Sequence, residues 1–177
     1  ENLEYLYLDE NHLDGSIPSS IEDLINLKAL LLDDNDLSGL IPIEIGNLTT
    51  LINLKLSGNE FSGDIPEEIG QLVNLDALWL HENKLMGDVP DWCSSLSLSW
   101  SDISKFNIAN NRLCPEYPEC IASYVGTQNT AGCFEDITCP EGEVALFGEC
   151  VNPLAEDFEF ENIAGEIPPE IGELENL

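Results

Sequence analysis

The sequence has very few basic residues. Its 177 residues include five Lys plus Arg against 35 Asp plus Glu, which gives a formal charge of −30 at pH 7. This balance excludes nucleic-acid binding through the chain's own charge, because phosphate contacts need clustered lysine and arginine. It also disfavours binding to an anionic membrane surface. Hydrophobic residues still make up 43% of the chain, so we expect a buried core rather than disorder.

Long apolar runs and catalytic motifs are missing as well. No stretch approaches about 18 consecutive apolar residues, so we expect no direct membrane insertion. Residue 1 does not begin a signal-peptide pattern and resembles a cut inside a longer protein. His12 and His81 occupy different positions of the repeat described below, and the sequence contains no GxSxG, HExxH or glycine-rich phosphate loop. We therefore predict no enzymatic activity, no catalytic residues and no cofactor.

The sequence does contain a repeat of 24 residues. Leucine and asparagine recur at fixed spacing in four coils, and the same pattern returns 28 residues later in a fifth coil with Ile103, Phe106, Ile108, Asn111 and Leu113. The positions in the first four coils are Leu3, Leu6, Leu8, Asn11, Leu13; Leu27, Leu30, Leu32, Asn35, Leu37; Leu51, Leu54, Leu56, Asn59, Phe61; and Leu75, Leu78, Leu80, Asn83, Leu85. Each of the first four coils also carries a glycine that is separated by one residue from an Ile-Pro or Val-Pro pair. These glycines are Gly15, Gly39, Gly63 and Gly87, and the same half-motif recurs at Gly165.

This pattern resembles the leucine-rich repeat family, and the LxGxIPxxIGxL half of each coil is similar to the plant-type, extracellular subclass. The resemblance covers residues 1–121 and 158–177. It implies an α/β solenoid, a right-handed coil with short parallel β-strands on the concave face, an irregular or short helical convex face, and disulfide-stapled caps. The residues agree, because alternating leucines lie on one face of a strand and one coil alone cannot close a core. Each asparagine follows its strand, where its amide can bridge backbone groups that the turn leaves unpaired.

Six cysteines predict disulfides and an extracellular or cell-surface location. Cys93 and Cys120 occupy the same phase of consecutive coils, and stacked coils about 4.8 Å apart bring such residues within disulfide distance. The alternative is a zinc site that includes Cys114 and Cys120, but the sequence has no CxxC pair. We therefore predict Cys93–Cys120, which leaves two further pairs, Cys114 with Cys133 and Cys139 with Cys150.

The chain divides into four predicted parts. They are a leucine-rich repeat array of 24-residue coils at 1–121, a C-terminal cysteine cap at 114–133, an acidic linker with the cysteine-loop N-terminal cap of a following unit at 134–157, and a partial coil at 158–177 that continues into a further or permuted array.

The two ends of the chain carry the same triplet. Residues 1–3 and 175–177 both read Glu-Asn-Leu in the same phase of the repeat, an offset of 174 residues. One interpretation is a single 174-residue unit cut from a tandem chain of such units. Circular permutation, a truncated gene prediction and coincidence are the alternatives.

The side chains between the strand leucines should face outward on the concave face. Their central column reads Tyr7, Leu31, Lys55, Trp79 and Asn107. Tyrosine and tryptophan supply contact area at low entropic cost, so this column indicates a binding surface. The alternative is that these side chains only cover the strand backbone. The predicted ligand-binding residues are Tyr5, Tyr7, Leu31, Lys55, Trp79 and His81, with Asp33 as a polar neighbour.

Acidic residues are stacked in two columns beside this surface. Asp9 precedes Asp33 by one coil, and Glu10 precedes Asp34. Like charges about 4.8 Å apart repel by roughly 0.9 kcal/mol even at the dielectric constant of water. Calcium would offset this repulsion, but the sequence has no DxDxDG loop, and we predict no metal site. A solvated acidic face is the commoner explanation, and a cationic partner also fits.

The predicted function is a non-catalytic extracellular recognition module. The family resemblance implies a protein, peptide or glycan ligand, bound through the concave face. The alternative is structural, a repeat unit of a long surface fibre or adhesin assembled end to end from 174-residue units with other copies of itself.

Overall fold

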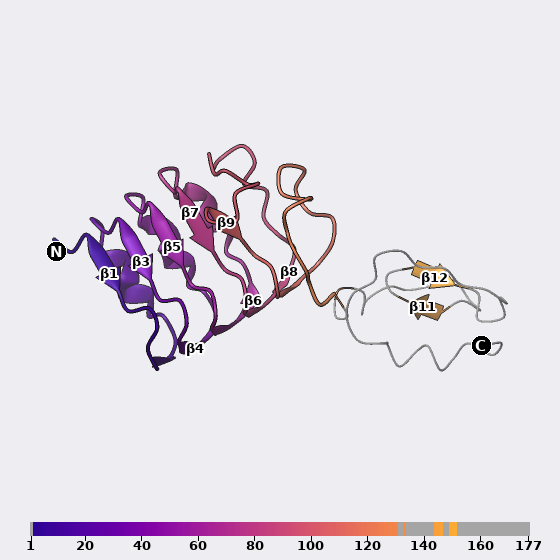
Figure 1. Cartoon of the computed structure of the whole chain (residues 1–177), viewed down its shortest axis with the longest axis horizontal. Coiled ribbons are helices and arrows are strands. Elements are labelled where there is room, and N and C mark those ends of the chain that lie inside the picture. Colours follow the sequence, from indigo (N-terminus) through magenta and orange to yellow (C-terminus); the bar gives the residue numbers. More distant parts are fainter. Residues whose placement is uncertain (1, 131–132, 134–143, 147–148, 152–177) are drawn as a thin grey trace.

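The computed structural model describes residues 2–130, 133, 144–146 and 149–151. Two parallel five-stranded sheets run along the repeat direction (Figure 1). The first sheet has the order β1-β3-β5-β7-β9, with bounds Tyr5–Tyr7, Ala29–Leu31, Asn53–Lys55, Ala77–Trp79 and Phe106–Asn107. The second has the order β10-β8-β6-β4-β2, with bounds Arg112–Leu113, Lys84–Gly87, Glu60–Asp64, Asp36–Gly39 and Asp14–Gly15. A separate antiparallel pair joins β11 (Val144–Leu146) to β12 (Glu149–Val151).

The first sheet is the predicted concave one, and its register follows the repeat. Leu30 lies opposite Leu54, and Leu54 lies opposite Leu78. All three leucines are fully buried, which makes the inner side of the sheet one wall of a continuous core. We call the solvent-facing side of β1, β3, β5, β7 and β9 the concave face. The leucine-rich repeat fold class is thereby confirmed.

The convex face is short helical, and its helices are 3-10 turns. In the described residues these are η1 (Ser19–Asp23), η2 (Ile43–Asn47) and η3 (Glu67–Gln71), each preceded by the proline of an Ile-Pro pair. Proline suits this position because its missing N–H would have no helical partner there. Gly46 lets η2 and η3 approach closely, since a Cβ at this residue would lie 2.6 Å from the carbonyl oxygen of Glu68. No helix in this part of the chain is both long and apolar enough to cross a bilayer.

The second sheet is a feature that the sequence pattern did not predict. Its strands begin shortly after the recurring asparagines, and glycines with positive φ lie at or near the C-terminal ends of β2, β4, β6 and β8. At Gly39, for example, the backbone angle φ is 81°, a value that residues other than glycine rarely adopt. These glycines turn the chain from the second sheet toward the proline and the 3-10 helix, so the recurring glycine marks the end of a strand.

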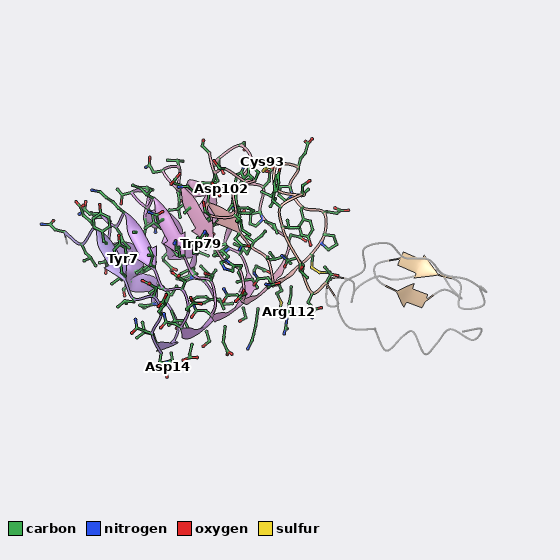
Figure 2. The ribbon with its side chains drawn as sticks, viewed as in Figure 1. Tyr7, Asp14, Trp79, Cys93, Asp102 and Arg112 are labelled. Carbon is green, nitrogen blue, oxygen red and sulfur yellow. A yellow bond between two sulfur atoms is a disulfide. The ribbon has the colours of Figure 1, made fainter. Side chains whose placement is uncertain are left out.

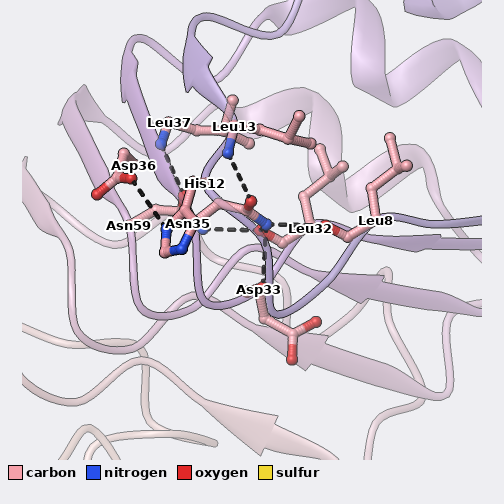
Figure 3. A network of polar contacts seen from close by, with 9 residues as sticks. All are labelled: Leu8, His12, Leu13, Leu32, Asp33, Asn35, Asp36, Leu37 and Asn59. Atoms are coloured by element: carbon pink, nitrogen blue, oxygen red, sulfur yellow. Dashed lines mark hydrogen bonds and ion pairs between the residues drawn. The ribbon is translucent and has the colours of Figure 1, made fainter.

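The recurring asparagines form a ladder that joins neighbouring coils. The Nδ2 atom of Asn59 donates to the carbonyl oxygens of Leu32, Leu56 and Ser57 at 2.9, 3.2 and 3.0 Å. Its Oδ1 atom accepts from the backbone N–H of Leu37 at 2.9 Å. Asn35 makes the equivalent four contacts one coil earlier (Figure 3). The predicted bridging role of the asparagines is confirmed.

Gln128 extends this ladder past the fifth coil, into the predicted cap at 114–133. Its Nε2 atom donates to the carbonyl oxygens of Ile108 and Val125 at 3.0 and 2.8 Å, and its Oε1 atom accepts from the N–H of Leu113 at 3.3 Å. Gln128 is 5% exposed, and its backbone forms an isolated parallel β-bridge with Asn111. Gln128 therefore supplies hydrogen-bond partners to backbone groups at the turn of the fifth coil, a role that the repeat spacing did not reveal.

The fifth coil departs from the expected pattern at Ile103. The repeat predicts a buried side chain at this position, but Ile103 is 73% exposed, so that prediction is wrong. The cause is a local turn, in which the Asp102 carboxylate accepts hydrogen bonds from the backbone N–H and the hydroxyl of Ser104 at 2.9 and 2.7 Å. Trp100 packs edge-on against Phe106 instead, with ring centroids 5.0 Å apart.

Two disulfides close the C-terminal end of the array. Cys93 and Cys120 are bonded with their Cα atoms 5.6 Å apart, and Cys114 and Cys133 with theirs 5.3 Å apart. The repeat phase predicted Cys93–Cys120, and Cys114–Cys133 is one of the two pairs that this prediction left. The third expected pair, Cys139 with Cys150, falls outside the residues whose side chains are described.

Asn59→Ala should destabilise the fold strongly. The substitution removes four hydrogen bonds and leaves buried backbone groups unsatisfied, so we expect a loss of about 2–3 kcal/mol in the free energy of unfolding. Urea denaturation followed by circular dichroism measures this. Asn11→Ala is the matched control, because exposed Asn11 donates only within its own coil, and it should cost less than about 1 kcal/mol. Equal losses in the two variants would contradict the ladder.

Candidate functional site

The strand register places the predicted central column in one row on the concave face. Tyr7 lies opposite Leu31, Leu31 opposite Lys55, Lys55 opposite Trp79, and Trp79 opposite Asn107. Figure 2 shows Tyr7 and Trp79 on different strands of this sheet. The adjacent side chains alternate in and out because the intervening leucines of each strand point into the core. The sheet therefore positions this row without the help of any loop.

Trp79 is held by contacts on several sides. Its Nε1 atom donates to the carbonyl oxygen of Ser104 at 3.2 Å, which ties it to the irregular fifth coil. The ammonium group of Lys55 lies 3.5 Å from the centroid of the indole ring, a cation–π contact. The ring of His81 meets it edge-on, with centroids 5.8 Å apart. Trp79 is thus a half-buried aromatic group with little freedom to lose on binding.

Asp33 and His81 are two partly buried polar residues beside the ends of the concave strands. The Oδ1 atom of Asp33 and the Nδ1 atom of His81 are buried and have no hydrogen-bond partner among the described residues. Burial raises the pKa of the Asp33 carboxyl, and a backbone hydrogen bond and the charge of Lys55 oppose this shift, while the charges of Asp9 and Asp34 add to it. Burial lowers the pKa of the His81 imidazole, which favours its neutral form.

The β1 end of the face is more open. Tyr5 and Tyr7 are 52% and 59% exposed, and their ring centroids lie 6.0 Å apart. Lys28 lies 6.0 Å from the centroid of the Tyr5 ring and pairs with Glu4, with 2.7 Å between Nζ and Oε2. The structure therefore brings the predicted residues into one strip, with Tyr5 and Tyr7 at one end and Trp79 and His81 toward the other.

Most of the acidic side chains along this strip have no cationic partner. The ion pairs found in the described residues are Lys28–Glu4, Lys84–Glu60, Lys105–Asp76 and His12–Asp36. Asp9, Asp33 and Asp34 take part in none of them. Within the same residues, no three His, Cys, Asp or Glu side chains are arranged to hold a metal ion. The strip therefore combines aromatic surface with unpaired negative charge.

The arrangement does not resemble a catalytic relay. Asp33, Ser57 and His81 occupy the same repeat position in consecutive coils, so serine lies between the carboxylate and the imidazole. A Ser-His-Asp relay needs the histidine in the middle, with hydrogen bonds to both neighbours.

A shallow hollow of about 350 Å³ lies elsewhere, beside the end of the asparagine ladder. Lys84, Arg112 and Gln128 are among the residues that line it, and none of the predicted ligand-binding residues is. Sequence reasoning missed this hollow, because it depends on Gln128 taking the place of a ladder asparagine.

The comparison with family models identifies the repeats. The model described as Leucine Rich Repeat matches residues 2–24, 26–48 and 50–72. The crystal structure of the BIR2 ectodomain from Arabidopsis thaliana is 34% identical with a TM-score of 0.57, and the match covers 65% of this chain and 58% of that one. The chain belongs to the plant-type leucine-rich repeat family.

Two further leucine-rich repeat structures contain bound partners. The plant peptide hormone receptor RGFR1 in complex with RGF2 is 33% identical with a TM-score of 0.58, covering 67% of this chain and 18% of that one. The BIR3–SERK2 complex from Arabidopsis thaliana is 34% identical with a TM-score of 0.59, covering 70% and 66%. The chain thus spans between about a fifth and two thirds of these relatives. The comparison with curated protein sequences found no match.

We expect nuclear magnetic resonance titration to give His81 a pKa below the ordinary 6.5, because burial disfavours the imidazolium. The unfolded chain then binds this proton more readily than the folded one, so His81 destabilises the fold as the pH falls through 6.5. Trp79→Ala removes the ring beside the imidazole and should raise the pKa toward 6.5. A wild-type value at or above 6.5 would contradict this environment.

Proposed function

We propose that this leucine-rich repeat chain is a non-catalytic recognition module that binds a protein or peptide through the concave face. The observation that carries the proposal is the row of Tyr7, Leu31, Lys55 and Trp79, which the strand register aligns across four coils. Binding surfaces of high affinity are built around rigid aromatic anchors. Trp79 meets this description, because Lys55 and the Ser104 carbonyl already hold its ring.

The relatives support a polypeptide partner. RGFR1 is described as a peptide hormone receptor in complex with RGF2, and BIR3 is found in complex with SERK2. The extended strip of the concave face suits such a partner, since its outward side chains come from several coils.

An extracellular location fits the cap. Disulfides such as Cys93–Cys120 and Cys114–Cys133 form and persist mainly in oxidising compartments and are rare in reducing ones. BIR2, which shares the fold, is described as an ectodomain.

End-to-end assembly into a fibre is the second candidate. Leu3, Leu8 and Leu13 of the first coil are 40%, 37% and 37% exposed, and a further coil stacked on β1 would bury them. Under this alternative, negative-stain electron microscopy of the concentrated chain should show rods with a regular axial repeat. Isolated short arcs would remove self-assembly of this chain from contention.

Trp79→Ala should weaken the binding of every ligand that the concave face recognises. Immobilised wild type and variant can be compared by surface plasmon resonance against a panel of secreted peptides and receptor ectodomains. Loss of a central aromatic anchor should reduce affinity at least about tenfold. Val73→Ala is the control, because Val73 is 61% exposed and lies outside the concave sheet. Ligands that bind Trp79→Ala as tightly as wild type would place recognition elsewhere on the molecule.

A further inference from the structure

Two lysines of the concave face lie against aromatic rings of a neighbouring coil. Lys55 lies 3.5 Å from the ring centroid of Trp79, and Lys28 lies 6.0 Å from that of Tyr5. Lys28 also pairs with the carboxylate of Glu4. A cation over an aromatic face with a carboxylate nearby is a favourable arrangement. The chain's own residues therefore show the kind of contact that this face can make with a positive charge.

Tyr7 offers the same surroundings without a lysine of its own. The ring is 59% exposed, and no cation lies over it among the described residues. Leu31 lies beside Tyr7 in the register, and the backbone bond from Glu10 N–H to the Asp33 carbonyl, at 2.9 Å, continues the pairing past the end of the strands. Asp9 and Asp33 are therefore neighbours at the same end of this pair of coils. We call Tyr7, Asp9, Leu31 and Asp33 the Tyr7 subsite.

Asp33 is the member of the subsite that most needs a cation. Its side chain is partly buried, its Oδ1 atom has no hydrogen-bond partner in the described part of the chain, and it forms no ion pair there. Lys55 of the next coil lies over Trp79 and not within ion-pair distance of Asp33. A backbone hydrogen bond and the charge of Lys55 compensate only part of the solvation that the Asp33 carboxylate has lost, and a cation supplied by a ligand offsets more of that cost.

The arrangement selects an organic cation over a metal ion. No three carboxylates or imidazoles in the described residues are placed to coordinate a metal. Calcium and magnesium would need such a set of oxygen ligands. A guanidinium group instead needs one carboxylate for its paired N–H donors and one flat surface on which to stack. Asp33 supplies the carboxylate, and Tyr7 supplies the flat surface.

We propose that the Tyr7 subsite receives an arginine side chain from a basic segment of the polypeptide ligand. This assignment rests on the proposed function, because it names the partner chemistry of the same surface. The formal charge of −30 adds long-range attraction for such a segment. Asp33 and Tyr7 then decide where its arginine side chain is held.

A pair of synthetic peptides tests the chemistry. The probe is a fluorescein-labelled peptide with three arginines separated by Gly-Ser, and its counterpart carries citrulline, which replaces each guanidinium with a neutral urea of nearly the same shape. Fluorescence anisotropy in about 0.15 M salt limits the contribution of distant charges. The arginine peptide should bind at least about tenfold more tightly than the citrulline peptide. Equal binding of the two peptides would overturn the proposal.

Matched variants separate the subsite from the overall charge. Asp33→Asn and Tyr7→Leu should each weaken the arginine peptide at least about fivefold. Glu67→Gln on η3 changes the net charge as Asp33→Asn does, and Tyr124→Leu removes a tyrosine that is 46% exposed in the cap. Both controls should stay within about twofold of wild type. An equal loss in Glu67→Gln and Asp33→Asn, or no loss in Asp33→Asn and Tyr7→Leu, would overturn the proposal.

Two readouts keep this result separate from the proposed function. The thermal melt of Tyr7→Leu should match wild type, since Tyr7 is exposed. Asp33→Asn should melt no lower than wild type, since the asparagine keeps the shape of the aspartate and removes the cost of its partly buried charge. Suppose that Asp33→Asn and Tyr7→Leu bind the arginine peptide as wild type does, while Trp79→Ala still weakens binding of the ligands found in the panel. The assignment of an arginine to the Tyr7 subsite is then wrong, and recognition by the concave face stands. If Trp79→Ala also leaves binding unchanged, both proposals fall.

Discussion

Each coil of this solenoid depends on the asparagine of the next coil to satisfy its turn. Asn59 joins Leu32 and Leu37 of the preceding coil to Leu56 and Ser57 of its own, so its side chain has no complete set of partners within a single coil. Because the turn carbonyls are buried, leaving them unpaired would cost about 1–3 kcal/mol for each group. Cohesion therefore passes from neighbour to neighbour, as expected for a solenoid.

The same coupling positions the concave face. Once the turns are in register, the strands must place Tyr7, Leu31, Lys55 and Trp79 side by side, because each occupies the same phase of its coil. Recognition on such a surface needs no flexible loop, and the side chains lose little freedom when a partner binds. The bond from Trp79 to the Ser104 carbonyl shows that the irregular fifth coil also serves this surface, although its own strand residues lie at the end of the row.

The sequence predicted what depends on periodicity and missed what depends on a particular neighbour. The strand leucines, the bridging role of Asn35 and Asn59, and the Cys93–Cys120 bond all follow from repeat phase, and the structure shows each of them. Gln128 lies at none of the repeat spacings, so only the folded cap reveals that it completes the ladder. Ile103 fits the spacing but faces solvent, because hydrogen bonds to Asp102 override the weak preference of one apolar residue for the core.

The net charge of the chain and the positions of its carboxylates on the surface support different conclusions. As a net charge of −30 it argues against nucleic acid and anionic membranes as partners. On the concave face individual carboxylates differ, because Lys28 and Lys105 form ion pairs with Glu4 and Asp76, while Asp33 forms no ion pair in the described residues. Stacking coils in register forces like charges into columns, and each column must find its cations within the chain or in solution. An aromatic ring beside an unpaired carboxylate makes a bound basic side chain more favourable than diffuse counterions, because the ring also excludes water from the contact.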